Sequence, residues 1–414
     1  MRWGRMFQAQ RWRRLDTACS LISDPPQPFT NKNMWRDLNV RQIGVCATRL
    51  SLRRVLSAAI VLLFLSSLWV LFDDPNETLR YTYDVPVVLS WSRFFGRDFT
   101  DVLVNHENWQ ACPRKCVFTS DKRLLNVSSV ILFHAWNFYE DSFPETSPGQ
   151  LKVFFSQEAP TLTPKRYFKD IPEDYFNITS SYRLDSDIPL PYGTFRKLEK
   201  RRTELPGEIE AALSQKRNLA FQLISNCHTH SQREVLGREL SRHANITSYG
   251  RCFEAPCDKD CEVQAIESHY FYLAFENAVC SDYVTEKFFR LRHGIVPVVL
   301  SRQVIERIAP KGSFIAVDDF ETVAKLAEYL VYLTQNPKEY RKYFEWMKEY
   351  EIAFDTVSLT CELCEAAYNQ KRGQVKDIQT LWFENQCQRG YAAQGLPGLS
   401  FYESLMQWMF VPDL

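Results

Sequence analysis

The pattern of apolar and polar positions is most regular between residues 218 and 355. Short apolar runs with strand character follow one another there, at residues 219–224, 246–249, 270–275, 296–300 and 314–317. Between them apolar residues recur at helical spacing, at residues 231–240, 282–292 and 321–333. Strands that are apolar throughout and alternate with helices are typical of a parallel, doubly wound sheet. This pattern predicts an α/β domain over residues 218–355.

A less regular mixed region precedes this domain, over residues 86–195. Helical or loop segments separate its apolar runs, which predicts a second α/β layer; the runs lie at residues 87–89, 101–104, 130–133 and 152–155. The densely charged segment 196–217 predicts a solvated linker with one short helix. We expect the C-terminal segment 356–414, with aromatic helical stretches at 378–383 and 401–410, to pack back onto the first domain.

One apolar run, residues 55–72, is longer than the others. Its eighteen uncharged residues just meet the length that a membrane span requires. Arg53 and Arg54 precede it, acids follow it, and residues 1–54 contain eleven Lys or Arg against three acids. The positive-inside rule therefore predicts a cytoplasmic tail at 1–54, a signal anchor at 55–72 and a stem at 73–85. A cleaved signal peptide is the alternative, but the segment before the run is very long, and no small-x-small cleavage site follows.

The composition places the rest of the chain in the secretory pathway. Four N-x-S/T sequons lie beyond the predicted span, at Asn76, Asn126, Asn177 and Asn245. Ten of the twelve cysteines also lie there, which favours disulfides. Cys361 and Cys364 have the spacing of a redox or zinc half-site, but a second CxxC at zinc spacing is missing, so we favour a structural disulfide. The net charge is zero, so no global basic field points to nucleic acid.

Polar residues gather where the predicted strands of the 218–355 domain end. Asn226, Tyr249, Glu276 and Asn277 each lie at or just beyond the end of an apolar run. The carboxyl ends of parallel strands meet at one edge of a sheet, and ligands of such folds bind at that edge. The sequence therefore predicts a binding site there, with side chains suited to hydrogen bonds with a base or a sugar.

Two cations, Arg233 and Lys287, lie near predicted helix starts. Lys287 belongs to the stretch FYLAFENAVCSDYVTEKFF, in the first turn of a helix expected to begin at residue 281 or 282, where a cation is unfavourable. A bound phosphate would explain its place. The alternative is a surface pair between Glu286 and Arg290, with Lys287 solvated. Neither GxGxxG nor a Walker loop is present, so hydride transfer and NTP hydrolysis lack their motifs.

The stretch FYLAFENAVCSDYVTEKFF, followed by GIVPVVL, resembles the signature of glycosyltransferase family 10, the α1,3-fucosyltransferases. Further segments match in order: CVFTSDKRLL, VILFHAWNF, FFSQEAP, SYRLDSDIPLPYGTF, LISNCHTHSQRE, ITSYGRC, FIAVDDFETVAKLAEYL, CELC and IQTLWF. The resemblance is collinear over residues 100–385. It implies a GT-B type α/β fold, in which two Rossmann-like domains face each other across a cleft, with GDP-fucose as donor and transfer with inversion.

The resemblance also implies roles for individual residues. Glu158, in FFSQEAP, matches the general base that takes the proton of the acceptor hydroxyl. Arg233 and Lys287, with the helix start expected at 282, would meet the charge on the leaving GDP. The positions that match the donor site are Asn226, Tyr249, Glu276, Asn277, Tyr283 and Glu286. The alternative for Glu158 is a buried structural acid.

Some positions depart from the family pattern. Glu158 is followed by Ala-Pro where the family has Ser-Pro, PVVL is followed by Ser-Arg where Gly-Pro is frequent, and His-Ala-Trp at residues 134–136 replaces a double-His stretch. These departures bear on the acceptor more than on the donor. The D-x-D at residues 185–187 is a pattern that holds a divalent metal in GT-A enzymes. Because it lies in the first domain here, we expect no metal site, although Mn²⁺ or Mg²⁺ could stimulate without being essential.

The activity implied is that of a Golgi α1,3-fucosyltransferase acting on N-acetylglucosamine of glycoprotein N-glycans, with the core residue favoured by the VTEKFF form. The alternatives are a Lewis-type N-acetyllactosamine acceptor, protein O-fucosylation in the endoplasmic reticulum, and a catalytically silent glycan-binding membrane protein. Intact Glu158, Arg233 and Lys287 argue against the last. The expected partners are GDP-fucose, a glycan acceptor and the lipid bilayer through residues 55–72, without nucleic acid, and a homodimer is compatible with the sequence.

Overall fold

The computed structural model describes residues 84–104, 112–140, 142–354, 359–370, 373 and 377–392. The predicted cytoplasmic tail and signal anchor, nearly all of the stem, and the helical stretch expected at 401–410 lie outside these residues. Within the described ranges, no helix is both long and apolar enough to cross a membrane.

The first sheet has six strands, and all of their pairings are parallel. The strands are β1 (Val87–Ser90), β2 (Val117–Thr119), β3 (Val130–His134), β4 (Leu151–Ser156), β5 (Ile178–Ser181) and β6 (Ile188–Pro189), in the order β2-β1-β3-β4-β5-β6. The central strands are buried almost throughout, as expected of a parallel sheet covered on both faces. The short helices of this region are α2 (Phe99–Val104), η4 (Lys122–Val127), η5 (Ala135–Glu140), η6 (Pro160–Leu162) and η7 (Lys165–Phe168).

The apolar run at 101–104 belongs to α2, so its assignment to the strand pattern is wrong. Phe99 and Leu103, four residues apart, are the buried positions of α2, and this is helical spacing.

The second sheet has five strands, again with parallel pairings only. They are β8 (Asn218–Leu223), β9 (Ile246–Tyr249), β10 (His269–Leu273), β12 (Val296–Val299) and β13 (Ile315–Ala316), in the order β13-β12-β10-β8-β9. Each lies where an apolar run predicted it.

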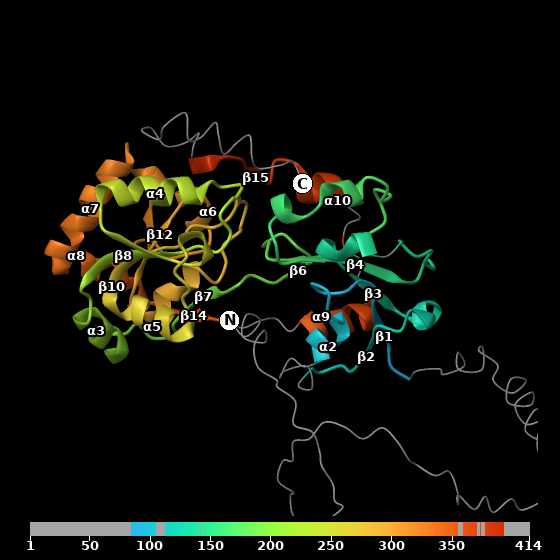
Figure 1. Ribbon diagram of the computed structural model, residues 1–414. Helices are drawn as coiled ribbons and strands as arrows, with labels where there is room; N and C mark the ends of the chain where they lie inside the picture. Colours follow the sequence, from blue (N-terminus) through green and yellow to red (C-terminus); the bar gives the residue numbers. More distant parts are fainter. Residues whose placement is uncertain are drawn as a thin grey trace, which may run out of the picture. The chain divides into compact units, whose positions relative to one another are not determined.

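Helices cover both faces of the second sheet, with α4 and α7 on one side and α3 and α5 on the other (Figure 1). Their bounds are α3 (Gly207–Ser214), α4 (Arg233–His243), α5 (Lys259–Ser268), α6 (Arg302–Ile305), α7 (Val323–Gln335) and α8 (Pro337–Arg341), with short helices η8 (Arg251–Phe253), η9 (Phe288–His293), η10 (Val317–Asp319) and η11 (Lys342–Lys348). The start of α7 follows from its sequence, because the Thr322 hydroxyl caps it by accepting from the Lys325 backbone N–H at 3.2 Å.

The segment predicted as a solvated linker is partly ordered against the second sheet. β7 (Thr194–Lys197) pairs antiparallel with β14 (Tyr350–Ala353), and α3 supplies the one short helix. Phe195 of β7 packs its ring 5.2 Å from that of Trp346. The sequence did not predict this apolar contact, because only one of the four β7 residues faces the core and its neighbours in the segment are charged.

The C-terminal segment returns to the first sheet. α9 (Leu359–Asn369) packs against β1, β3 and α2, and α10 (Ile378–Phe383) places the Trp382 ring 5.1 Å from Phe154 of β4. The chain then continues to β15 (Cys387–Gln388), which pairs with β11 (Val279–Cys280) beyond the second sheet. α9, α10 and β15 of this segment are therefore held by distant parts of the chain.

The ten cysteines beyond the predicted span form five disulfides, which confirms that they are oxidised. The pairs are Cys112–Cys361, Cys116–Cys364, Cys227–Cys252, Cys257–Cys261 and Cys280–Cys387. The two cysteines of the CxxC are thus bonded as expected, each to a cysteine near β2 rather than to one another. They cross-link α9 to the first sheet.

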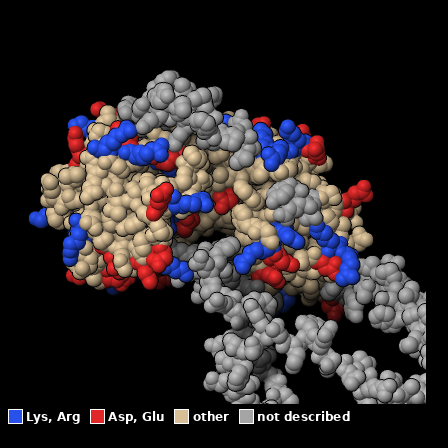
Figure 2. Space-filling model, in the orientation of Figure 1, with Lys and Arg blue, Asp and Glu red and all other residues tan. Residues whose placement is uncertain are grey.

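Acidic and basic side chains are interspersed over the face of the described residues drawn in Figure 2. This mixture agrees with the formal net charge of zero.

Candidate active site

The strand order of the second sheet marks one edge as a binding edge. Numbered along the chain, its five strands have the order 2-1-3-4-5, so connections leave β8 and β10 toward opposite sides. A crevice outside the carboxyl ends of two such strands is where ligands bind in doubly wound sheets. Asn226 follows β8, and Glu276 and Asn277 follow β10, so these predicted site residues belong to the switch point of the sheet.

The helix predicted over residues 282–292 is wrong. After β10 the chain forms β11, turns at Asp282 with φ of 59°, and becomes helical only in the short η9. The pairing of β11 with β15, together with the Cys280–Cys387 disulfide, holds this part of the chain extended. No helix begins at 282, so the helix N-terminus expected at that residue for an anion is absent; Lys287 instead flanks the start of η9.

Lys287 is held by a compact group of polar side chains. Its ammonium lies 3.1 Å from Glu276 Oε2 and 3.2 Å from Glu286 Oε1, and it donates to Thr285 Oγ1 at 2.8 Å. Glu276 Oε1 accepts from the Thr285 backbone N–H at 2.8 Å and from the Thr285 hydroxyl at 2.7 Å. We call Glu276, Thr285, Glu286 and Lys287 the lysine cluster.

Burial and charge act in opposite directions in the lysine cluster. Burial alone lowers the pKa of Lys287, but the carboxylates of Glu276 and Glu286 outweigh it, so the pKa lies above its ordinary value. Burial raises the pKa of Glu286, whereas Lys287 and Arg290 lower it below its usual range. The alternative interpretation, a pair of Glu286 with Arg290, is not found: Arg290 instead forms a salt bridge with Glu262 at 2.5 Å. Lys287 is therefore a charged, mostly buried cation rather than a solvated one.

Arg233 brings a second cation to the same edge. It is the first residue of α4, is 4% exposed, and donates from Nη1 to the Phe275 backbone carbonyl at 2.8 Å. Its Nε has no hydrogen-bond partner among the described residues. A buried donor of this kind normally has a partner, so its orphan state is a cost that a bound oxyanion would relieve.

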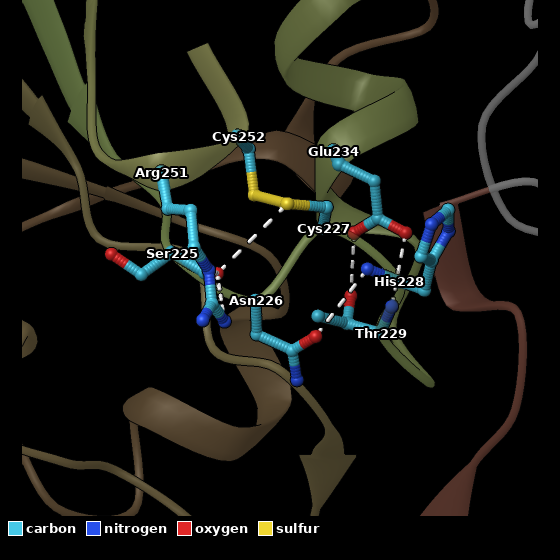
Figure 3. Close-up of a disulfide and its surroundings, with 8 residues drawn as sticks. All are labelled: Ser225, Asn226, Cys227, His228, Thr229, Glu234, Arg251 and Cys252. Atoms are coloured by element: carbon cyan, nitrogen blue, oxygen red, sulfur yellow. Dashed lines mark hydrogen bonds between the residues drawn. A yellow bond between two sulfur atoms is a disulfide. The ribbon is translucent and has the colours of Figure 1, made fainter. Parts of the chain in front are cut away.

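The loops after β8 and β9 are tied together beside this edge. The Cys227–Cys252 disulfide joins them, and Arg251 donates from Nε and Nη2 to the Ser225 carbonyl at 3.1 and 2.9 Å (Figure 3). Asn226 is exposed, and Tyr249 is half-buried at the end of β9. Both predicted donor-site residues therefore lie in or next to a cross-linked pair of loops.

Glu158 comes from the first sheet and lies against the motif of the second. It follows β4 by two residues, and its Oε2 accepts a hydrogen bond from the Tyr283 hydroxyl at 3.4 Å. Tyr283 is buried, with its ring 4.9 Å from that of Tyr182. Burial raises the pKa of Glu158 above its ordinary value, Lys287 and Tyr283 lower it, and Glu286 and Glu276 raise it. A carboxylate with a raised pKa suits general base chemistry near neutral pH.

Comparison with known proteins identifies the family. Residues 83–193 match the description "Fucosyltransferase, N-terminal", and residues 213–382 match "Glycosyltransferase family 10 (fucosyltransferase) C-term". The chain is 33% identical over 307 residues to alpha-(1,3)-fucosyltransferase fut-1 of Caenorhabditis elegans, covering 70% of this chain and 67% of the relative. It is 30% identical over 344 residues to alpha-(1,3)-fucosyltransferase C of Drosophila melanogaster, covering 74% and 80%.

The chain belongs to glycosyltransferase family 10, the fucosyltransferases. The predicted family and the predicted enzyme class, an α1,3-fucosyltransferase, are thereby confirmed. A solved α1,3-fucosyltransferase with GDP-fucose is also similar, at a TM-score of 0.45 and 14% identity, covering 70% of this chain and 91% of that chain.

The D-x-D of this fucosyltransferase is engaged in local structure. Asp185 forms a salt bridge with Arg183 at 2.5 Å, and Asp187 Oδ2 accepts from the Thr179 N–H and hydroxyl at 2.8 and 2.9 Å. Within the described part of the chain, no group of three or more His, Cys, Asp or Glu side chains is placed to hold a metal ion.

Sequence reasoning missed Thr285 in this fucosyltransferase. Its hydroxyl bridges Glu276 and Lys287, which are eleven residues apart in sequence. The only signal was a threonine two residues before the lysine in the VTEKFF segment, and a threonine at a turn is too common to be informative. The Cys227–Cys252 link was likewise open, because cysteine spacing does not fix connectivity.

Proposed function

We propose that this fucosyltransferase transfers fucose from GDP-β-L-fucose in α1,3 linkage, with inversion, to N-acetylglucosamine of glycoprotein N-glycans, preferentially the core residue. Family membership and the names of the relatives support fucosyl transfer and the linkage. The observation that carries the mechanism is the contact of Glu158, from the first sheet, with Tyr283 in the motif that holds Lys287. It brings a base and a cation to one place.

Glu158 is the general base in this proposal. The acceptor hydroxyl oxygen forms a bond with the anomeric carbon of fucose while Glu158 takes the hydroxyl proton, and the bond from that carbon to the diphosphate oxygen breaks. GDP leaves with the electron pair. A single displacement by attack opposite the leaving group inverts the anomeric carbon, and an anionic leaving group needs no general acid.

Lys287 and Arg233 bind the diphosphate in this proposal. The ammonium acts as a point charge, and the orphan Nε of Arg233 supplies a donor directed by its hydrogen bond to the Phe275 carbonyl. Both groups are already in place before the reaction, so stabilising the charge that develops on GDP costs little reorganisation.

Residues 55–72 anchor the enzyme in the Golgi membrane in this proposal, with the catalytic part in the lumen. The uncharged run, the basic segment before it and the sequons after it support a type II orientation. Glycosidase treatment of intact microsomes tests this orientation: sequons protected from an added glycosidase until detergent is present are expected, and digestion without detergent would overturn it.

An acceptor panel tests the activity. The purified full-length chain in detergent is incubated with GDP-fucose and a core N-glycopeptide, N-acetyllactosamine or a folded protein acceptor, and the linkage is determined. Preferred α1,3 transfer to the core residue is expected. Preferred transfer to lactosamine would replace the core assignment with a Lewis-type one, transfer to protein hydroxyls would indicate O-fucosylation, and no transfer at all would overturn the proposed activity.

A further inference from the structure

The loops after β8 and β9 form a rim, residues 224–229 and 250–255, which we call the β8–β9 rim. Strands β8 and β9 pair in parallel up to Leu223 and Tyr249, and the ladder continues beyond them. The Ile224 N–H donates to the Tyr249 carbonyl at 2.9 Å, and the Cys252 N–H donates to the Ile224 carbonyl at 3.2 Å. The two loops therefore run side by side at the carboxyl edge of the second sheet.

A glycine lets the two loops approach closely. Gly250 has φ of 106°, and a Cβ at this position would lie 2.3 Å from the Ile224 carbonyl oxygen. Any side chain would force the loops apart, and the positive φ is a conformation that other residues rarely adopt. Both the close approach and the backbone angle therefore require glycine here.

Further bonds close the β8–β9 rim around the Cys227–Cys252 disulfide. Two of the three Arg251 guanidinium nitrogens, Nε and Nη2, donate to the Ser225 carbonyl, and the Asn226 side-chain oxygen accepts from the His228 N–H at 3.4 Å. Figure 3 shows the Asn226 side chain directed away from the disulfide, toward the His228 backbone N–H. The rim thus presents the exposed side-chain amide of Asn226 on a backbone that the disulfide and the Arg251 hydrogen bonds hold in place.

The position of the β8–β9 rim relates it to the lysine cluster. The connection from β8 to α4 begins in the rim at Ile224 and ends at Gln232. Within it, the Ser231 hydroxyl donates to the Glu276 carbonyl at 2.7 Å and the Ser231 N–H donates to the Asn277 carbonyl at 3.0 Å. Strands β10 and β9 lie two strand spacings apart, about 10 Å. The rim is therefore within reach of the nucleoside of a nucleotide whose diphosphate meets Lys287.

We propose that the Cys227–Cys252 disulfide is a positioning element for the donor's nucleobase, holding the β8–β9 rim in the shape that distinguishes one nucleoside diphosphate from another. This inference rests on the proposed function. A side-chain amide both donates and accepts, and it discriminates between bases only while its orientation is fixed. Preorganising a loop improves affinity by removing the cost of ordering it on binding.

The experiment compares two disulfides of the same enzyme. The double variant Cys227→Ser/Cys252→Ser removes the rim disulfide, and Cys257→Ser/Cys261→Ser removes the neighbouring bond, which closes a separation of only four residues. Dissociation constants for GDP and ADP are measured by calorimetry on the full-length chain in detergent, at a temperature where circular dichroism shows every variant folded, and KM and kcat for GDP-fucose are measured alongside.

Loss of the rim disulfide is expected to raise the dissociation constant of GDP about three- to tenfold, the cost of ordering one or two side chains. The ADP constant should change less, so the preference for GDP falls, and KM for GDP-fucose rises with kcat nearly unchanged. The matched double variant should keep the wild-type preference. Lys287→Ala should weaken GDP and ADP by the same factor, because the diphosphate is common to both.

Other outcomes separate this inference from the proposed function. A wild-type preference for GDP in Cys227→Ser/Cys252→Ser, with only a lower melting temperature, would show that the disulfide is purely structural and would overturn the inference alone. A wild-type chain that binds GDP no more tightly than ADP would overturn the proposed donor itself.

Discussion

The carboxyl edges of the two sheets are built from different chemistry. At the second sheet, a mostly buried lysine lies within 3.2 Å of two carboxylates, a buried arginine has an unused donor, and a disulfide joins adjacent loops. At the first sheet, aromatic side chains surround His134, whose pKa burial lowers to about 4, so it is neutral at pH 7. Glu158 follows the next strand of that sheet.

The difference corresponds to the charge of the two proposed substrates. A nucleoside diphosphate is anionic and loses hydration when it binds. Its site therefore needs cations that stay protonated, to compensate for the lost hydration. A sugar hydroxyl is neutral, so its site needs a base but no cation to balance a charge. Four substitutions test this contrast, in order of decreasing effect.

Glu158→Gln should give the largest effect, because it removes the proposed general base and leaves the proposed donor site intact. We expect kcat to fall by about two to four orders of magnitude, while calorimetry shows GDP binding within about twofold of wild type. Glu145→Gln, at an exposed carboxylate in the same lobe, is the matched control and should leave kcat unchanged. Wild-type turnover in Glu158→Gln would remove Glu158 from the base role.

Lys287→Ala should have the second-largest effect. It removes the cation between Glu276 and Glu286, so that these carboxylates would repel the diphosphate of the proposed donor. The dissociation constant of GDP should rise by about 30-fold or more, the typical cost of removing one member of a buried charge pair. The control is Lys325→Ala, at an exposed helix position paired with Glu328, which should bind GDP normally. An unaltered GDP affinity in Lys287→Ala would mean that the lysine cluster is structural.

Thr285→Val should have a moderate effect, because the hydroxyl holds Glu276 and Lys287 at once. Losing a hydrogen bond to a charged group costs about 1.5–3 kcal/mol, so KM for GDP-fucose should rise about tenfold or more. Thr285→Ser keeps the hydroxyl and should restore most of the affinity. If the valine and serine variants have equal KM values, the hydroxyl does not position the cluster. Thr334→Val, at a half-buried position outside the lysine cluster, is the control.

Tyr283→Phe should have the smallest effect and a definite sign. Glu158 must be ionised to act as a base, so kcat falls as the pH drops through its pKa. The Tyr283 hydrogen bond lowers that pKa, so its removal should shift the acidic limb of the pH–rate profile to higher pH, by about one unit or less. Tyr332→Phe, at an exposed tyrosine, should leave the profile in place. A shift to lower pH would contradict the assignment.

The strands were the most predictable part of the fold. The apolar runs at β3, β4, β8, β10 and β12 predicted strands because a parallel sheet buries both faces of its strands. The failures came where distant contacts override local spacing. Residues 282–292 show helical spacing, but the pairing of β11 with β15, about a hundred residues away, keeps the start of this segment out of a helix.

The candidate site divides in the same way. Its residue types and their places after strands could be inferred, because a parallel sheet collects its strand ends on one edge. The Thr285 bridge, the orphan Nε of Arg233 and the tied rim could not, since each depends on side-chain directions set by packing.

By itself the amino-acid sequence determined that this protein has two parallel α/β sheets and belongs to the fucosyltransferases, because apolar periodicity and collinear motifs are local properties of the chain. Only the tertiary structure decided which cysteines pair, which carboxylates surround Lys287, and that Glu158 meets Tyr283 from 125 residues away. These contacts join segments that have no local preference for one another, and burial of the surrounding core brings them together.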